Sequence, residues 1–153
     1  METKKNGYNT GIASEYLVLS MLYRLDAKAY MTLGNEKRVD IRIAKTDGSW
    51  ISVDVKSVRS SDSIPVSNVE PKDGHYIIFV IYNNKFELQC TVVENSKKKF
   101  VDPTFPDFYI VPSKYVAEKK TKYKLKNGGE RFNIFKKDIV DYKNKWEQLG
   151  LSE

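Results

Sequence analysis

The strongest constraint on the fold is an alternation of apolar and polar residues over two neighbouring segments, 38–44 and 50–58. Because side chains of a β-strand point alternately to opposite faces, each segment is expected to be a strand with one apolar and one polar face. The dipeptide Asp47-Gly48 between them is typical of a tight hairpin turn. The sequence therefore predicts a two-stranded hairpin that packs one face against the rest of the protein.

The polar face of this hairpin carries residues that can do chemistry. Asp40 lies on the first strand, and Asp54 and Lys56 lie on the second, where their spacing of two places both on one face. If the apolar faces of the strands align, the two carboxylates share the opposite face. A solvated strand face also needs polar residues, so Asp40 and Lys56 could equally be cross-strand partners with no further role. The alternation alone leaves both interpretations open.

A helical pattern precedes the hairpin. Apolar residues of 11–26 recur with the 3.6-residue period of an amphipathic helix, and Glu15 falls in the middle of the apolar stripe. A lone carboxylate in such a position is costly unless it is paired or bound to a cation. Glu15 therefore favours a site at which the acidic residues gather around a divalent cation. A place at the edge of the helix, where Glu15 reaches solvent or an arginine, is the alternative.

The rest of the chain completes an α/β pattern. We expect a strand over 27–33, a loop over 59–75, a buried central strand over 76–82, strands over 85–93 and 108–111 separated by a loop over 97–106, a helix over 114–120 capped by Ser113, a turn at Gly128-Gly129, and a terminal helix over 137–149. No internal repeat or linker divides the sequence, so residues 1–153 are expected to form a single domain.

Composition agrees with one globular domain, because 41% of the 153 residues are hydrophobic and 12% are aromatic. No apolar run approaches the roughly 20 residues of a transmembrane helix, and the first residues lack the apolar segment of a signal peptide. Cys90 is the only cysteine, which excludes an intrachain disulfide and predicts a buried thiol in a reducing, cytoplasmic location. His75, the only histidine, is expected to be a structural or surface residue.

The net charge of +6 suits a polyanionic partner such as nucleic acid, although many proteins are basic without one. Lysines are concentrated in 114–126, with two tyrosines among them, a pattern that suits phosphate contacts with occasional base stacking. A solvated basic loop is the alternative for this segment. We expect contacts with nucleic acid from three arginines that flank the acidic residues and from four of these lysines: Arg38, Arg42, Arg59, Lys119, Lys120, Lys122 and Lys124.

Taken together, Glu15 on a helix, Asp40 on a strand and Asp54-Val55-Lys56 on the next strand resemble the motif of the PD-(D/E)xK nuclease superfamily. The order of helix, hairpin and apolar central strand over 11–82 is similar to its restriction-endonuclease-like αβββαβ core. The sequence departs from the pattern in that Val39, rather than proline, precedes Asp40, and no helix is evident over 59–75. The resemblance implies an α/β fold with a mixed central sheet flanked by helices.

The resemblance also implies roles for these residues. Asp40, Asp54 and the backbone carbonyl of Val55 would bind Mg²⁺, with Mn²⁺ as a substitute, and Glu15 would bind the ion directly or through water. Lys56 would orient or help to deprotonate the attacking water. The implied activity is that of a Mg²⁺-dependent endonuclease on DNA, restriction-like or junction-resolving, for which a homodimer is the simplest assembly. A non-cleaving nucleic-acid-binding module and a protein-interaction domain are the alternatives.

Overall fold

The computed structural model describes residues 7–35, 37–83, 90–94, 97–101 and 105–151, with 90–94 and 97–101 described by their backbone. The elements are, in chain order, α1 (Gly7–Arg24), β1 (Lys28–Met31), β2 (Ile41–Ala44), β3 (Trp50–Val58), β4 (Ser63–Pro65), β5 (His75–Ile81), β6 (Cys90–Glu94), β7 (Lys97–Val101), β8 (Asp107–Pro112), α2 (Ser113–Lys119), β9 (Thr121–Lys124), β10 (Glu130–Phe135) and three short 3-10 helices, Lys136–Asp138, Val140–Tyr142 and Trp146–Leu149. None of the described helices is long and apolar enough to cross a membrane.

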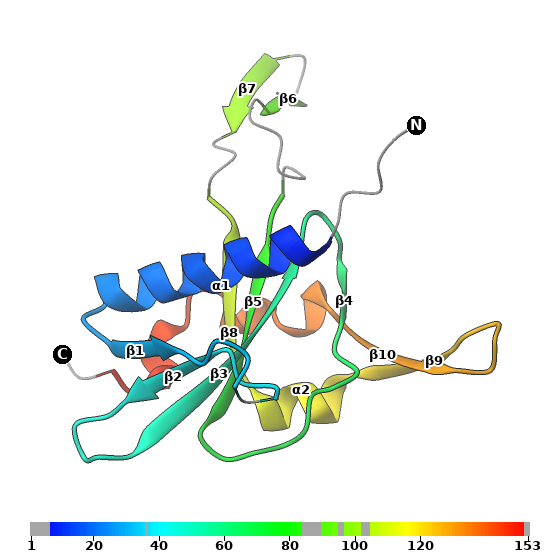
Figure 1. Ribbon diagram of the computed structural model, residues 1–153. Helices are drawn as coiled ribbons and strands as arrows, with labels where there is room; N and C mark the ends of the chain where they lie inside the picture. The colour runs from blue at the N-terminus through cyan, green and yellow to red at the C-terminus, as the bar shows by residue number, and fades with distance from the viewer. Residues whose placement is uncertain (1–6, 36, 84–89, 95–96, 102–104, 152–153) are drawn as a thin grey trace.

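A mixed five-stranded sheet in the order β1-β2-β3-β5-β8 forms the centre of the molecule (Figure 1). The helix α1 crosses one face of this sheet. On the other face lie α2 and a three-stranded sheet in the order β4-β10-β9. β6 and β7 pair with each other as a separate two-stranded ribbon. The expected architecture, an α/β fold with a mixed central sheet flanked by helices, is therefore confirmed.

The predicted hairpin is present. β2 and β3 pair in antiparallel register, with Ile41 opposite Val53, and β3 has the bounds that the alternation predicted. Gly48 adopts a φ of 82° at the turn, a conformation that suits glycine. β2 is shorter than the predicted segment 38–44, because Arg38 has a φ of 65° and leaves the extended conformation.

The connection from β3 to β5 contains no helix. β5 runs parallel to β3, with Asp54 opposite Ile77, and it is buried along nearly its whole length as the apolar run 76–82 predicted. Between the two strands the chain forms β4, which pairs with β10. In the αβββαβ core a helix would follow β3. Here the short strand β4 with β10, together with α2, covers that face of the central sheet instead.

Two apolar cores hold the layers together. One lies between α1 and the central sheet, and its buried members include Val18, Leu22, Ile41, Ile43, Val53 and Ile78. The other lies between the opposite face of the sheet and the elements that cover it, and its members include Ile64, Ile77, Phe79, Val116, Ile134 and Ile139. Because both faces of β5 are covered, this strand is apolar at almost every position.

The prediction of a terminal helix over 137–149 is wrong. Within this segment Asn144 has a φ of 54°, its N–H donates to the carbonyl of Phe108 over 2.9 Å, and Lys143 forms a β-bridge with Tyr109. The segment therefore forms short 3-10 turns, which are interrupted where the backbone at Lys143 and Asn144 pairs with β8. Ile139 and Leu149 are nevertheless buried, as the apolar stripe of this segment predicted.

Two further local predictions are wrong. The hydroxyl of Ser113 does not cap α2; it donates to the carbonyl of Lys72 over 2.9 Å and accepts the N–H of the same residue over 3.0 Å. It thus ties the start of α2 to the connection before β5. The loop predicted over 97–106 contains β7, whose antiparallel pairing with β6 supplies its backbone partners. The side chain of Cys90 on β6 lies outside the described part of the chain.

Candidate active site

Asp40 lies just before β2 and is held against β3 at two points. Its carboxylate oxygen Oδ2 accepts a hydrogen bond from the backbone N–H of Val55 over 2.7 Å. Its own backbone N–H donates to the carbonyl of Val53 over 2.8 Å. The side chain thus takes the place of a backbone partner for β3, and this fixes the carboxylate next to the position of Asp54.

Asp54 and Lys56 form an ion pair on the same face of β3. The Nζ atom of Lys56 lies 2.9 Å from Oδ2 of Asp54, as their spacing of two residues predicted. Asp54 is only 4% exposed, and it is flanked in the sheet by Ile77 of β5. An isolated carboxylate at such a position would be costly, so the ammonium group of Lys56 is needed to balance its charge.

The carboxylates of Asp40 and Asp54 interact directly. Burial raises the pKa of Asp40 to about 6, and a hydrogen bond and charge repulsion from Asp54 act in the same direction. The N–H of Val55 and the charge of Lys56 oppose this rise. The protein thus holds the carboxyl group of Asp40 beside that of Asp54, where burial and repulsion disfavour ionisation of Asp40.

Glu15 approaches this pair from α1. It lines the same pocket as Asp40, and burial together with the charge of Asp40 raises its pKa. The prediction that Glu15 lies in the middle of the buried stripe is wrong, because that stripe runs through Thr10, Ser14, Val18 and Leu22 and leaves Glu15 half-buried at its side. The sequence pattern missed this because it counted apolar residues, whereas the stripe begins with two small polar ones.

The four residues form a series of neighbouring pairs, in which Asp40 lies next to both Glu15 and Asp54, and Asp54 binds Lys56. Among the residues that the structure describes, no group of three or more Asp, Glu, His or Cys side chains is arranged to hold a metal ion. Proteins commonly bind Mg²⁺ through only one or two carboxylates, because the ion keeps several of its water ligands. The all-oxygen pair of Asp40 and Asp54 therefore fits a hard divalent cation.

The three arginines expected to contact nucleic acid each have a protein partner or a partly buried position. Arg38 forms an ion pair with Glu70. The Nε of Arg59 donates to the hydroxyl of Thr10 over 2.7 Å. Arg42 is half-buried on β2 and lines a surface hollow next to β1. Of the three, Arg38 and Arg42 lie within two residues of Asp40 in the sequence.

The four lysines expected to contact nucleic acid lie on the second sheet and the end of α2. Lys120 donates to the carbonyl of Val69 over 3.0 Å, and Lys122 lies 2.5 Å from a carboxylate oxygen of Glu130. Lys119 and Lys124 are exposed. β9 and β10 form a hairpin that extends as an arm from the body of the molecule (Figure 1), so Lys122 and Lys124 are on a paired strand and not on the loop considered as the alternative, whereas Lys119 ends α2 and Lys120 follows it.

His75 is a residue of the site region for which the sequence suggested no contact. It is buried, and its Nδ1 lies 2.7 Å from the hydroxyl of Ser52. Burial lowers its pKa, and the charges of Lys72 and Lys56 lower it further. The parallel register of β3 and β5 brings Ser52 opposite His75, and only knowledge of that register could have predicted the contact.

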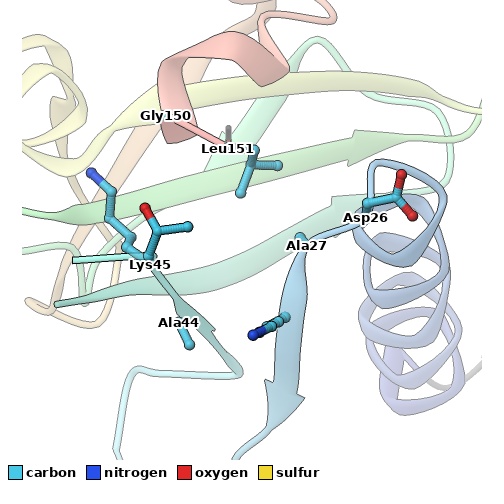
Figure 2. A pocket seen from close by; sticks show the side chains of 8 residues that line it. Asp26, Ala27, Ala44, Lys45, Gly150 and Leu151 are labelled. Atoms are coloured by element: carbon cyan, nitrogen blue, oxygen red, sulfur yellow. The ribbon is translucent and has the colours of Figure 1, made fainter. Parts of the chain in front are cut away.

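A separate pocket of about 100 Å³ lies at the far end of β2, where the terminal segment meets the start of β1 (Figure 2). Asp26 and Lys45 are among its lining residues, together with Leu151. Its volume is below the roughly 300 Å³ of typical small-molecule sites. It also lies beyond Ala44, at the opposite end of β2 from Asp40.

Comparisons with known proteins agree with this architecture. No protein-family model and no curated protein matches the chain. Among solved structures, the chain is similar to that of a bacterial homing endonuclease, I-Ssp6803I, with a TM-score of 0.54 and 15% sequence identity. The match covers 94% of this chain and 92% of the other. At this level of identity the similarity defines the fold, which is restriction-endonuclease-like, as the resemblance implied.

Proposed function

Because the chain has the restriction-endonuclease-like fold, we propose that it is a Mg²⁺-dependent endonuclease that hydrolyses phosphodiester bonds of DNA. The observation that carries this proposal is the neighbouring pair of carboxylates on Asp40 and Asp54: the former accepts the N–H of Val55 over 2.7 Å, and the ammonium of Lys56 lies 2.9 Å from the latter. A structural ion pair requires only one acid. A second acid beside the first adds repulsion that a bound cation would relieve.

Asp40 and Asp54 would hold the ion through carboxylate oxygens, and Val55 through its backbone carbonyl. In an extended strand the N–H and C=O of one residue face the same neighbour. Since the N–H of Val55 points to Asp40, its carbonyl faces the same edge of β3. Glu15, which lines the same pocket as Asp40, would hold a water of the ion. When bound, Mg²⁺ supplies positive charge at the phosphate and makes a coordinated water more acidic, and Mn²⁺ could replace it.

Lys56 would act on the attacking water and on the phosphate. Its ammonium group is held by Asp54 and is partly exposed, so it can donate a hydrogen bond out of the ion pair. Donation to the water orients it, and donation to a phosphate oxygen stabilises the charge that develops there. Asp54 positions Lys56 in both cases. This route needs no covalent bond between the protein and DNA.

DNA is the polyanion that these observations favour. The protein of similar fold is a homing endonuclease. The net charge of +6 and the exposed lysines of β9 and α2 would contact phosphates away from the cleaved bond. Arg38 and Arg42 would contact phosphates near it. One site cuts one strand, so cutting both strands would be simplest for a homodimer with two-fold symmetry.

A non-cleaving nucleic-acid-binding module is the second candidate. One observation favours it: within the described residues, no three potential metal ligands come together. In that case the pair of Lys56 and Asp54 would be purely structural.

Cleavage of linear, supercoiled and branched DNA by the purified protein separates the two functions. The reactions contain Mg²⁺, Mn²⁺ or EDTA, and Asp54→Asn is compared with Asp73→Asn, which alters an exposed acid outside the site. The endonuclease proposal predicts metal-dependent cleavage by the wild type and by Asp73→Asn but not by Asp54→Asn, with DNA affinity in EDTA preserved in all three. Absence of cleavage on every substrate with both ions, together with retained affinity, would support the binding module instead.

A further inference from the structure

A pocket of about 440 Å³ opens beside two of the acidic residues, Glu15 and Asp40. One side is formed by α1 and the other by Met31 together with the turn that follows it, residues 32–34. The volume falls within the range of about 300–1,000 Å³ that is usual for small-molecule sites. It is therefore large enough for a single nucleotide, whereas the pocket at the far end of β2 is not.

Apolar and aromatic side chains form most of this pocket although it opens to solvent. Tyr8 is 68% exposed, Tyr16 is 57% exposed and Leu33 is 77% exposed. Large apolar groups that gather at the surface mark binding sites more often than single exposed ones do. Here they adjoin two carboxylates, so the occupant should combine a flat apolar surface with an anionic group that the cation of the proposed function would hold at the acidic end. A nucleotide has both, in its base and its phosphate.

The helix α1 carries two tyrosines on nearly the same side as Glu15. Tyr8, Ile12 and Tyr16 are spaced four residues apart, so successive side chains are rotated by only about 40° around α1. Glu15 lies only about 20° beyond Tyr8 around the helix and lines the same pocket. One face of the first turns of α1 thus offers both stacking surfaces and a carboxylate.

The opposite wall is tied to Asp40. The N–H of Thr32 donates to the carbonyl of Asp40 over 2.9 Å, and the N–H of Asn35 donates back to Thr32 over 3.0 Å. Within this turn Leu33 adopts a φ of 52°, which is uncommon for a residue other than glycine. These bonds fix the backbone of the turn that carries Leu33 relative to the backbone of Asp40.

We propose that this pocket binds a nucleobase that has left the base stack, in the nucleotide next to the phosphate at Asp40 and Asp54. The inference rests on the proposed function and specifies its substrate class. In a continuous duplex the base must first be unpaired and unstacked, which costs free energy, whereas a nucleotide in a gap, flap or mismatch is already unpaired. The preferred substrate is therefore DNA with an unpaired nucleotide beside the cleaved bond.

Binding of DNA with Ca²⁺ in place of Mg²⁺ keeps a divalent cation at the acidic residues and tests this proposal without requiring catalysis. The probe is a duplex with a short single-stranded gap that contains 2-aminopurine, whose fluorescence reports base stacking, and the reference is the same duplex without the gap. Tyr16→Ala should weaken binding of the gapped DNA by about 5- to 150-fold, the loss typical of one stacked base, and should change binding of the continuous duplex much less. Tyr16→Phe should preserve the binding and the fluorescence change.

Two further variants control for folding and location. Leu33→Asn removes an apolar wall but keeps a residue type that tolerates a positive φ, and it should also weaken binding of gapped DNA. Tyr23→Ala alters another tyrosine of α1, 55% exposed, that does not line the pocket, and it should leave binding unchanged. The melting temperature of each variant shows that it is folded.

Several outcomes would overturn the nucleobase site. These are equal losses for gapped and continuous DNA, an equal effect of Tyr23→Ala, or a change in self-association of Tyr16→Ala with unchanged DNA binding, which would make this face a contact between two copies. If the protein cleaves DNA but its DNA affinity does not depend on Tyr16, the endonuclease proposal stands and the nucleobase site is wrong. If the protein binds the unpaired base through Tyr16 but cleaves no DNA, the nucleobase site stands and the endonuclease proposal is wrong.

Discussion

The carboxylate of Asp40 accepts the backbone N–H of Val55 over 2.7 Å, at the point where pairing between β2 and β3 begins. This contact makes an acidic side chain part of the framework of the sheet and brings it beside the acid of the next strand. The position of Asp40 is therefore determined by backbone pairing, which is rigid, and not by a mobile loop. A site built this way can keep two like charges close together in the absence of a ligand.

The first prediction concerns Asp40→Asn and the dependence of stability on pH. Since the pKa of Asp40 is raised to about 6, the folded protein binds this proton more tightly than the unfolded chain does. The contribution of Asp40 to the free energy of unfolding therefore falls as pH rises from about 4 to 6, and this contribution stays low above that range. Without metal, Asp40→Asn should raise the free energy of unfolding at pH 8 by about 1–2 kcal/mol, measured by urea denaturation in EDTA.

At pH 4 the same substitution should have little effect, because the native carboxyl group is then protonated. The exposed Asp73→Asn serves as the control and should leave stability unchanged at both pH values. A loss of stability in Asp40→Asn at pH 8 would mean that the negative charge of Asp40 stabilises the metal-free wild type. That result would contradict the repulsion expected between the neighbouring carboxylates of Asp40 and Asp54.

The second prediction concerns stabilisation by divalent cations. A cation that binds Asp40 and Asp54 must compete with the proton of the former, so it should stabilise the protein more at pH 8 than at pH 5. At a concentration about 100 times its dissociation constant, Mg²⁺ or Mn²⁺ should raise the melting temperature by about 5–10 °C. Asp54→Asn should lose this shift, and Asp73→Asn should keep it. A shift of the same size in Asp54→Asn would place the cation elsewhere.

The third prediction concerns Lys56→Met. Removal of the ammonium group leaves the nearly buried carboxylate of Asp54 without its partner, which should cost about 2–4 kcal/mol of stability. The double variant Asp54→Asn with Lys56→Met should recover much of this loss, because no buried charge is left unbalanced. Urea denaturation of the four proteins forms a double-mutant cycle, and additive effects of the two changes would argue against a coupled pair.

The fourth prediction concerns the lysines of the β9–β10 arm. If Lys122 and Lys124 contact phosphates, changing both to glutamine should reduce the slope of log affinity against log salt concentration by nearly two. Lys28→Gln on the outer strand β1 provides a control and should not alter the slope. Fluorescence anisotropy of labelled DNA at several salt concentrations measures these slopes. An unchanged slope in the double variant would remove this arm from the DNA interface.

The sequence predicted best where one local rule determines the structure. The alternation over 50–58 set both bounds of β3 and put Asp54 and Lys56 on one face, because a strand has a strict period of two. The continuous apolar run at 76–82 likewise predicted a strand covered on both faces. The similarity of the whole chain to a solved endonuclease structure agrees with the core inferred from these elements.

Prediction failed where contacts distant in sequence decide the local structure. The segment 137–149 has helical periodicity, but Asn144 and Lys143 bond to β8, and no local pattern reveals such pairing. The contact of Ser52 with His75 depends on the register of two parallel strands joined by a long connection. Glu15 was placed wrongly within its helix because Ser14 is fully buried, and its hydroxyl lies 3.0 Å from that of Tyr82.

The most direct test of the central claim is the rate of DNA cleavage under single-turnover conditions in Mg²⁺ for the wild type and for Asp40→Asn, Asp54→Asn and Lys56→Met. If these residues form a cation-dependent catalytic site, each substitution should lower the rate at least about 100-fold while Asp73→Asn leaves it unchanged, and EDTA should abolish cleavage by the wild type. Cleavage by Asp54→Asn at the wild-type rate, or a wild type that cuts no DNA with Mg²⁺ or Mn²⁺, would contradict the account.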